Sequence, residues 1–122
     1  MNNENTSNLI FRKLKQDDYN KGFLSLLSQL TTVGTVDENT FNHTFEKIIN
    51  NNIEVWVFED LEAQKIVATA SLLIEQKFIH DCGLVGHLED VVVDQNYRGF
   101  SLGVKLIEKI VNIAKEKKCY KL

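Results

Sequence analysis

The stretch GHLEDVVVDQNYRGFSLG, residues 86–103, decides the fold of this chain. It holds an apolar run from Leu88 to Val93 that contains two adjacent acids, then a glycine-bearing turn that leads into a long amphipathic segment. A short apolar run bounded by turn residues indicates a buried strand, and apolar residues at helical spacing indicate a helix. The first N–H groups of a helix converge and carry a partial positive charge. We therefore expect a phosphate-bearing ligand at this junction of strand, turn and helix.

The turn itself has the residue types that an anion site requires. Gly99 and Gly103 would let the backbone approach a ligand closely and adopt positive φ. Arg98 supplies a charged donor, and Lys105 adds another from the first helical turn. Tyr97, just before the turn, is expected to pack rather than to bind phosphate. A plain connection between strand and helix would use the same glycines for geometry alone, and the spacing does not separate the two interpretations.

The acidic pair Glu89 and Asp90 is a second candidate for chemistry. Successive strand residues point to opposite faces, so helices on both faces would leave at least one carboxylate partly desolvated. Such a group has a raised pKa and can accept a proton from an amine nucleophile, directly or through a water. An acid at the edge of the sheet, or one paired with a nearby lysine, is the alternative interpretation.

Hydrophobic periodicity predicts one α/β domain over the whole chain. The expected strands are residues 9–15, 53–59, 65–79 and 87–94, with residues 119–122 beginning another. The expected helices run from a cap at Asp17 or Asp18 to Leu30, from a cap at Asp37 to Ile49, and over residues 102–118, with Leu106, Ile107, Ile110, Val111 and Ala114 inward and Lys105, Glu108 and Lys109 outward.

Composition excludes several classes of function. The chain has 122 residues and a net charge of −3, so it lacks the basic footprint of a nucleic-acid binder. No apolar run approaches the roughly 20 residues that cross a bilayer. Residues 1–7 are polar, which predicts a flexible tail rather than a secretory signal. Cys82 and Cys119 have no metal-ligand spacing, even with His80 and His87 nearby, and predict a reducing, cytoplasmic setting without a metal.

Four segments carry a resemblance to a known family. They are residues 30–35 (LTTVGT), 74–80 (IEQKFIH), 83–91 (GLVGHLEDV) and 119–121 (CYK). In this order and spacing the chain, from about Leu9 to Leu122, resembles the glucosamine 6-phosphate N-acetyltransferases of the general control-related N-acetyltransferase (GNAT) superfamily. The resemblance implies the acyl-CoA N-acyltransferase fold, a mixed, mostly antiparallel sheet flanked by helices. It also implies a bulge in the fourth strand, where the backbone pairs with the pantetheine arm of acetyl-CoA.

The same resemblance implies a function and a set of site residues. The function is acetyl transfer from acetyl-CoA to the amine of glucosamine 6-phosphate, for UDP-N-acetylglucosamine biosynthesis, by a homodimer. Glu89 would be the general base, with Asp90 beside it. The implied acceptor site is Thr31, Lys77, Phe78, Ile79, His80, Glu89, Asp90 and Val91. The implied acetyl-CoA site is Val91, Val92, Val93, Arg98, Gly99, Phe100, Ser101, Leu102, Gly103 and Val104, with Ser101 standing where the superfamily usually has glycine.

Members of the family continue beyond Cys-Tyr-Lys into a completed fifth strand, a helix and two further strands. The resemblance therefore implies a chain that is incomplete at its C-terminus and lacks an acidic sugar ligand, a tyrosine and an arginine. Two alternatives stay open. One is an N-acetyltransferase of another small amine or of a protein N-terminus, and the other is an inactive fragment that binds acetyl-CoA.

Overall fold

The computed structural model describes residues 8–122, and these form a five-stranded sheet in the order β1-β2-β3-β4-β5. The strands are β1 (Leu9–Lys13), β2 (Ile53–Asp60), β3 (Lys65–Gln76), β4 (Leu84–Val93) and β5 (Cys119–Lys121). The first four pair antiparallel, and β5 pairs parallel to β4. The predicted mixed, mostly antiparallel sheet is confirmed. The predicted tail, residues 1–7, lies outside the described residues.

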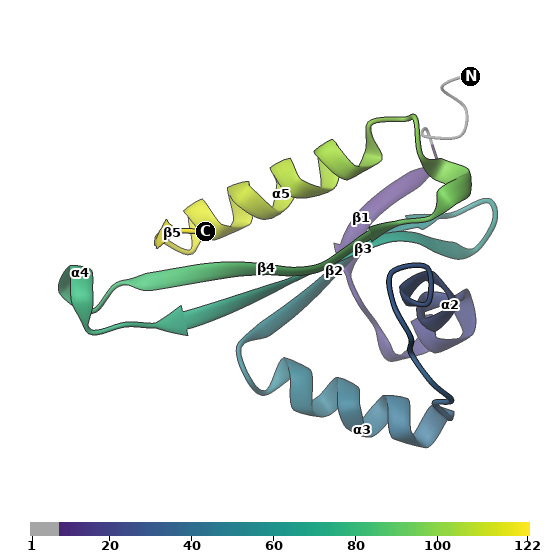
Figure 1. The fold of residues 1–122 in the computed structure, drawn as a ribbon, viewed down its shortest axis with the longest axis horizontal. Helices are drawn as coiled ribbons and strands as arrows, with labels where there is room; N and C mark the ends of the chain where they lie inside the picture. The colour runs from purple at the N-terminus through teal and green to yellow at the C-terminus, as the bar shows by residue number, and fades with distance from the viewer. Residues whose placement is uncertain (1–7) are drawn as a thin grey trace.

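Helices cover both faces of the sheet (Figure 1). One face carries α5 (Leu102–Glu116). The other carries the 3-10 helix η1 (Gln16–Lys21), α2 (Phe23–Leu27) and α3 (Glu38–Ile49). Among residues 8–122 no helix combines the length and the apolar character that crossing a bilayer requires.

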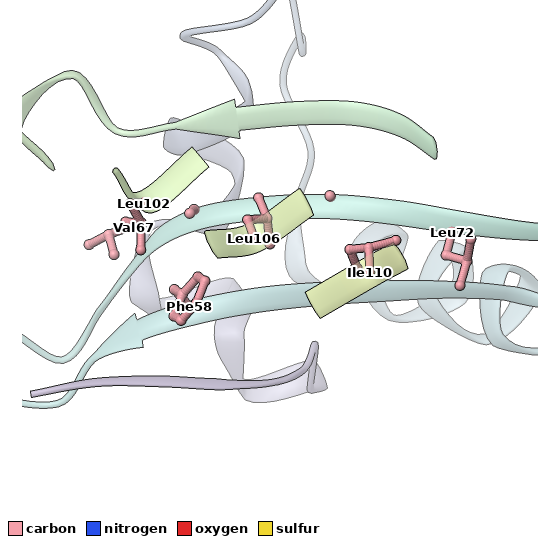
Figure 2. Packing of buried hydrophobic residues seen from close by; sticks show 8 residues of the cluster. Phe58, Val67, Leu72, Leu102, Leu106 and Ile110 are labelled. Carbon is pink, nitrogen blue, oxygen red and sulfur yellow. The ribbon is translucent and has the colours of Figure 1, made fainter. Parts of the chain in front are cut away.

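The cluster beneath α5 is the first of two cores (Figure 2). Leu106 and Ile110 are fully buried against Leu72 of β3, as helical spacing predicts. Lys105, Glu108 and Lys109 are exposed, which confirms the predicted outer face. The prediction that Ile107 points inward is wrong, because this side chain is 40% exposed. It lies one residue outside the apolar stripe that Leu102, Leu106, Ile110 and Ala114 form.

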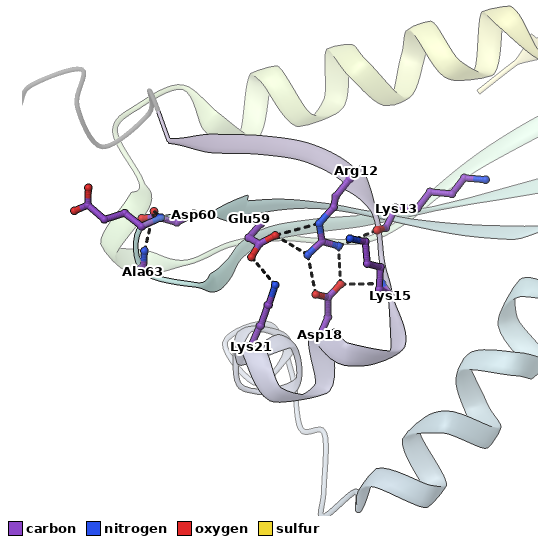
Figure 3. A network of polar contacts seen from close by, with 9 residues as sticks. Arg12, Lys13, Lys15, Asp18, Lys21, Glu59, Asp60 and Ala63 are labelled. Atoms are coloured by element: carbon purple, nitrogen blue, oxygen red, sulfur yellow. Dashed lines mark hydrogen bonds and ion pairs between the residues drawn. The ribbon is translucent and has the colours of Figure 1, made fainter.

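The predicted first helix is two short helices. Gly22, at φ +76°, ends η1 and changes the direction of the chain before α2. The prediction that Asp17 or Asp18 caps a continuous helix is wrong. Asp18 is instead fully buried, where it accepts the Lys15 N–H at 2.8 Å and pairs with Arg12 at 2.8 Å (Figure 3). Its carboxylate thus fastens η1 to β1.

The second predicted helix is confirmed, including its cap. The Asp37 carboxylate accepts the Thr40 N–H at 2.8 Å, which satisfies one of the free donors at the start of α3. Phe41 is buried in the second core, between α3 and the sheet, and Phe45 packs beside it. Ile49, the last residue of the helix, is 51% exposed.

A bulge interrupts β4 at Asp90 and Val91. Ser71 of β3 stands opposite Glu89, while Thr69 stands opposite Val92, so β4 has one residue more than β3 over this interval. Asp90 adopts φ +51° at this point. The bulge that the resemblance implied is therefore present.

The hairpin between β3 and β4 differs slightly from the prediction. Strand β3 ends at Gln76 rather than at residue 79, and β4 begins at Leu84 rather than at residue 87. Between them lies the short turn α4 (Ile79–Cys82), in which His80 and Asp81 have left-handed backbone angles. These angles are incompatible with a strand, so the extended pairing stops before them.

Candidate active site

The edge of β4 that faces β5 is open along most of its length. Within residues 8–122, β5 pairs with β4 only at Leu84 and Val85. Strand β5 ends beside Val85, and from Gly86 to Val93 the backbone groups on this side of β4 have no strand partner in the described part of the chain. A row of free N–H and C=O groups can pair with any ligand that offers alternating donors and acceptors.

The open edge leads directly into the anion turn, which we define as residues 94–101. Gly99 adopts φ +94°, a conformation that L side chains rarely adopt. Ser101 is the N-cap of α5 at φ +58°, and its side chain accepts no hydrogen bond from the helix. The first N–H groups of α5 are therefore left for a ligand. The expectation of positive φ at Gly103 is wrong, because Gly103 lies inside α5 and has an ordinary helical φ. A Cβ there would meet Val93 at an ordinary 3.6 Å.

Edge and turn together line one cleft of about 430 Å³. Most of the predicted acetyl-CoA residues line it, namely Val91, Val92, Val93, Arg98, Gly99, Ser101, Leu102, Gly103 and Val104. Phe100 is half-buried and is the predicted member that does not line the cleft. The opposite wall comes from Gln29 and Leu30, which follow α2. Sequence reasoning missed these two, because nothing local indicates that α2 ends beside β4.

Gln29 also joins the two walls of the cleft. Its Oε1 accepts the Gln95 N–H at 2.9 Å, across 66 residues of sequence. Arg98 lies on the other side, and its Nε donates to the Val93 carbonyl at 3.2 Å. The Arg98 guanidinium is thus held at the junction of β4 and the anion turn, where it can reach an anion.

The expected desolvation of the acidic pair is wrong. Glu89 and Asp90 are both exposed within the described part of the chain, and Asp90 lies at the bulge, where β4 leaves its regular pairing with β3. The two carboxylates border different hollows. Glu89 lines a hollow of about 610 Å³ between β4 and β5. Asp90 lines a mostly apolar cavity of about 210 Å³ beneath α2 and α3.

The predicted acceptor residues are only partly brought together. Lys77 and Ile79 line the same hollow as Glu89. Phe78 is 93% exposed at the tip of the hairpin, and the His80 ring packs at a tilt against Tyr120 of β5 with ring centroids 4.1 Å apart. Thr31 is exposed just past Leu30, and its N–H donates to the Leu27 carbonyl at 3.2 Å.

Charged side chains within this hollow form a small cluster. Glu75 accepts a hydrogen bond from His87 Nε2 at 2.9 Å when that nitrogen carries a proton, and it pairs with Lys77 Nζ at 3.2 Å. The His87 contact first, and Lys77 second, lower the pKa of Glu75. His87 and Glu89 are two residues apart on β4 and line the same hollow. Lys77 and Glu89 therefore line one hollow, in which Lys77 Nζ is held by Glu75.

Two residues at the closed end of the β2–β3 hairpin, Asp60 and Lys65, hold the anion turn. The Tyr97 hydroxyl donates to Asp60, and Asp94 is 1% exposed and pairs with Lys65 at 2.9 Å. Burial and the contact with Asp60 raise the pKa of Tyr97 to about 12. The prediction that Tyr97 packs is confirmed by its place against the first core. No cluster of three or more His, Cys, Asp or Glu side chains suited to a metal occurs within residues 8–122.

A family model described as the acetyltransferase (GNAT) family matches residues 14–122. This match covers most of the chain, including the bulge, the anion turn and α5. The chain belongs to the GNAT acetyltransferase family.

Comparison with individual relatives places the chain more closely within the GNAT family. The chain is 43% identical over 113 residues to glucosamine 6-phosphate N-acetyltransferase of Arabidopsis thaliana, covering 91% of this chain and 76% of that protein. It is 46% identical over 112 residues to the probable glucosamine 6-phosphate N-acetyltransferase of Drosophila melanogaster, covering 91% of this chain but only 51% of that protein. The crystal structure of the Arabidopsis enzyme superposes with a TM-score of 0.89 at 43% identity, over 93% of this chain and 78% of that one. Within the GNAT family the chain thus groups with the glucosamine 6-phosphate N-acetyltransferases.

Proposed function

We propose that this chain transfers an acetyl group from acetyl-CoA to the amine of glucosamine 6-phosphate, giving N-acetylglucosamine 6-phosphate for UDP-N-acetylglucosamine biosynthesis. One observation carries the proposal: the open edge of β4 leads without interruption into the anion turn, and both line a single cleft. The identity of 43% to the Arabidopsis enzyme supports the choice of acceptor.

In this proposal the cleft holds acetyl-CoA by its backbone. The pantetheine arm carries amide groups and pairs with Val91 to Val93 as an added strand would. The diphosphate lies against the N–H groups at the start of α5 and beside Arg98. The thioester then lies at the bulge, where Asp90 and Val91 leave the regular ladder with β3. A free N–H at this point can stabilise the oxyanion that forms on the thioester carbonyl.

Glu89 is the proposed general base. The ammonium of the acceptor has no lone pair, so it must lose a proton before attack, and the Glu89 carboxylate receives it directly or through a water. The neutral amine attacks the thioester carbon, the C–S bond breaks, and the leaving thiolate of coenzyme A takes up the second proton that the attacking nitrogen releases. The proton on Glu89 then passes to water. The exposure of Glu89 permits a water to take part. Most of the acceleration is then expected from holding the two substrates in place.

The proposed acceptor site combines Lys77 with the acidic pair. Lys77 supplies positive charge for the sugar phosphate, and Ile79 lines the same hollow. Phe78 and His80 belong to the same acceptor segment as Lys77 and Ile79. The protein is proposed to act as a homodimer, and the exposed ring of Phe78 offers an apolar surface for the contact between subunits. Thr31, at the end of the opposite wall, would contact the phosphate from that side. We place this single domain in the cytoplasm, and the proposal involves no metal.

The test combines binding with turnover. Calorimetry should detect uptake of acetyl-CoA by the 122-residue chain, and thiol release should be measured with a panel of amines that includes glucosamine 6-phosphate, glucosamine and a peptide with a free N-terminus. We expect release with glucosamine 6-phosphate above the others. Faster thiol release with another amine would show that this amine, and not glucosamine 6-phosphate, is the acceptor. Binding of acetyl-CoA without thiol release would show a chain that binds the coenzyme but does not transfer the acetyl group. Absence of binding would overturn the proposal.

A further inference from the structure

The anion turn is held from behind by a part of the fold that lines no part of the cleft. Behind it lies the closed end of the β2–β3 hairpin, where β2 ends at Asp60 and β3 begins at Lys65. None of the residues at this end belongs to the lining of the coenzyme cleft. Two separate contacts nevertheless connect the hairpin with the turn.

The first contact is made by Asp94, the first residue of the turn. Its carboxylate is 1% exposed, accepts the Asn96 N–H at 2.8 Å and pairs with Lys65 Nζ at 2.9 Å. Its own N–H donates to the Val67 carbonyl at 2.8 Å. Burial raises the pKa of Asp94, but the Asn96 and Lys65 contacts outweigh it and leave the pKa below its usual value. Asp94 thus remains ionised and fixed to β3.

The second contact is made by Tyr97, three residues later. Its hydroxyl donates to Oδ2 of Asp60 at 2.5 Å. The other oxygen of Asp60 accepts the N–H groups of Glu62 and Ala63, at 3.0 and 3.2 Å, and so closes the hairpin turn, as Figure 3 shows for Ala63. One carboxylate, 8% exposed, therefore orders the hairpin turn and anchors the anion turn together.

These contacts have a direct bearing on the affinity for an anion. Two buried acids behind an anion site would repel a diphosphate, yet the oxygens of each are occupied by donors, the Asn96 N–H and Lys65 at Asp94 and the Tyr97 hydroxyl with two hairpin N–H groups at Asp60. The two acids restrict the conformations that the anion turn can adopt. A turn already fixed at residues 94 and 97 loses less conformational freedom when its following N–H groups bind a ligand. The backbone at Gly99 and Ser101, with φ +94° and +58°, is held in its binding conformation in advance.

We propose that Asp60 and Tyr97, together with the Asp94–Lys65 pair, are positioning residues that make the β2–β3 hairpin a structural part of the coenzyme site. The proposal rests on the assignment of the anion turn to the diphosphate of coenzyme A. It predicts that affinity for the diphosphate depends on residues that do not touch it.

Tyr97→Phe is the most selective variant, because it removes one hydroxyl and keeps the ring that packs against the first core. Tyr19→Phe is the matched control, since it removes a hydroxyl that donates to the Val36 carbonyl at 3.1 Å on the other face of the sheet. Calorimetry with coenzyme A should give roughly five- to tenfold weaker binding for Tyr97→Phe, equivalent to one lost hydrogen bond. Pantetheine, which has the arm but no diphosphate, should bind both variants like the wild-type chain.

A second measurement examines the turn without ligand. Hydrogen exchange of the amides at residues 98–104 should be faster in Tyr97→Phe than in the wild-type chain and unchanged in Tyr19→Phe. Wild-type affinity of Tyr97→Phe for coenzyme A would overturn the inference, as would an equal loss in Tyr19→Phe or an equal loss for pantetheine. If the wild-type chain itself bound no coenzyme A, the proposed function would fail together with this inference, and that result differs from a loss confined to the variant.

Discussion

Glu89 is the side chain on which the proposed chemistry depends most. Glu89→Gln keeps the size of the side chain but cannot accept the proton from the ammonium. We expect turnover with glucosamine 6-phosphate to fall roughly 100-fold or more, while the Kd for acetyl-CoA is unchanged. Steady-state kinetics and calorimetry on the same preparation measure both quantities. Glu108→Gln, on the exposed face of α5, is the control. Wild-type turnover in Glu89→Gln would remove the residue from this role.

Gly99 is the residue of the anion turn with the strictest backbone requirement. At φ +94° an added Cβ is strained, so Gly99→Ala should lower the free energy of unfolding by roughly 1–3 kcal/mol. It should also weaken coenzyme A binding, because the backbone must move at the point where it meets the diphosphate. Urea unfolding and calorimetry test the two effects. Gly103→Ala is the matched comparison, with an ordinary contact of 3.6 Å to Val93 and little expected loss of stability.

At the scale of elements, a buried ion network joins β1, η1 and β2. Arg12 donates to Asp18 through two nitrogens, both at 2.8 Å, and also pairs with Glu59, which Lys21 contacts at 2.7 Å (Figure 3). Asp18→Ala leaves Arg12 with only one carboxylate partner. Removing one member of a buried pair costs roughly 3–5 kcal/mol, and the remaining Glu59 contact places the expected loss at the lower end of this range.

A double-mutant cycle separates this coupling from general damage. Arg12→Met combined with Asp18→Ala should lose less stability than the sum of the two single variants, because neither charge is then left alone. Urea unfolding of the four proteins gives the coupling energy. Additive losses would mean that the network contributes no coupling between β1 and η1.

Periodicity and capping rules predicted most of the helices and strands correctly. They failed where tertiary contacts determine the position or the exposure of a side chain. The apolar stripe of α5 and the cap at Asp37 are local signals, and both were predicted. Asp18 looks like an N-cap in sequence, but it is the third residue of η1, where its carboxylate accepts the Lys15 N–H and binds Arg12 of β1. The exposure of Glu89 depends on which neighbouring elements cover β4, and strand alternation alone does not contain this information. Gln29 and Leu30 reach the cleft only through the packing of α2 beside β4.

At the scale of the whole molecule, buried acids make stability depend on pH. Burial raises the pKa of Glu59, but contacts with Lys21 and Arg12 outweigh it, and the resulting pKa lies below the unfolded value of 4.5. A lowered pKa stabilises the fold above the unfolded value and loses this contribution as pH falls through the folded value. We therefore expect the free energy of unfolding to fall below about pH 4.5. Urea unfolding should show a shallower decline in Glu59→Gln, and an identical decline would contradict this assignment.

The exposed tip of the β3–β4 hairpin is a candidate contact between subunits. Phe78 and Ile79 are 93% and 61% exposed, which is unusual for two adjacent apolar side chains. If they form part of a homodimer contact, Phe78→Ser should shift the chain toward the monomer, with little change in its free energy of unfolding at low concentration. Light scattering over a range of concentrations measures this shift. An unchanged molecular mass in the variant would exclude the tip from the contact.

The extra residue in β4 serves the site rather than the core. Leu88 packs against the first core together with Val91 and Val93, while Val92 belongs to the second. Strict alternation over residues 88–93 would place Leu88 and Val92 on one side, so the bulge reverses the inside and outside of everything that follows it. Loss of the Asp90 codon would bring Val91 opposite Ala70 and keep the three valines in their present cores, because Glu89 already pairs with Ser71 and Val92 with Thr69. An in-frame deletion here should therefore leave a folded strand while removing the irregular backbone where the thioester is proposed to lie.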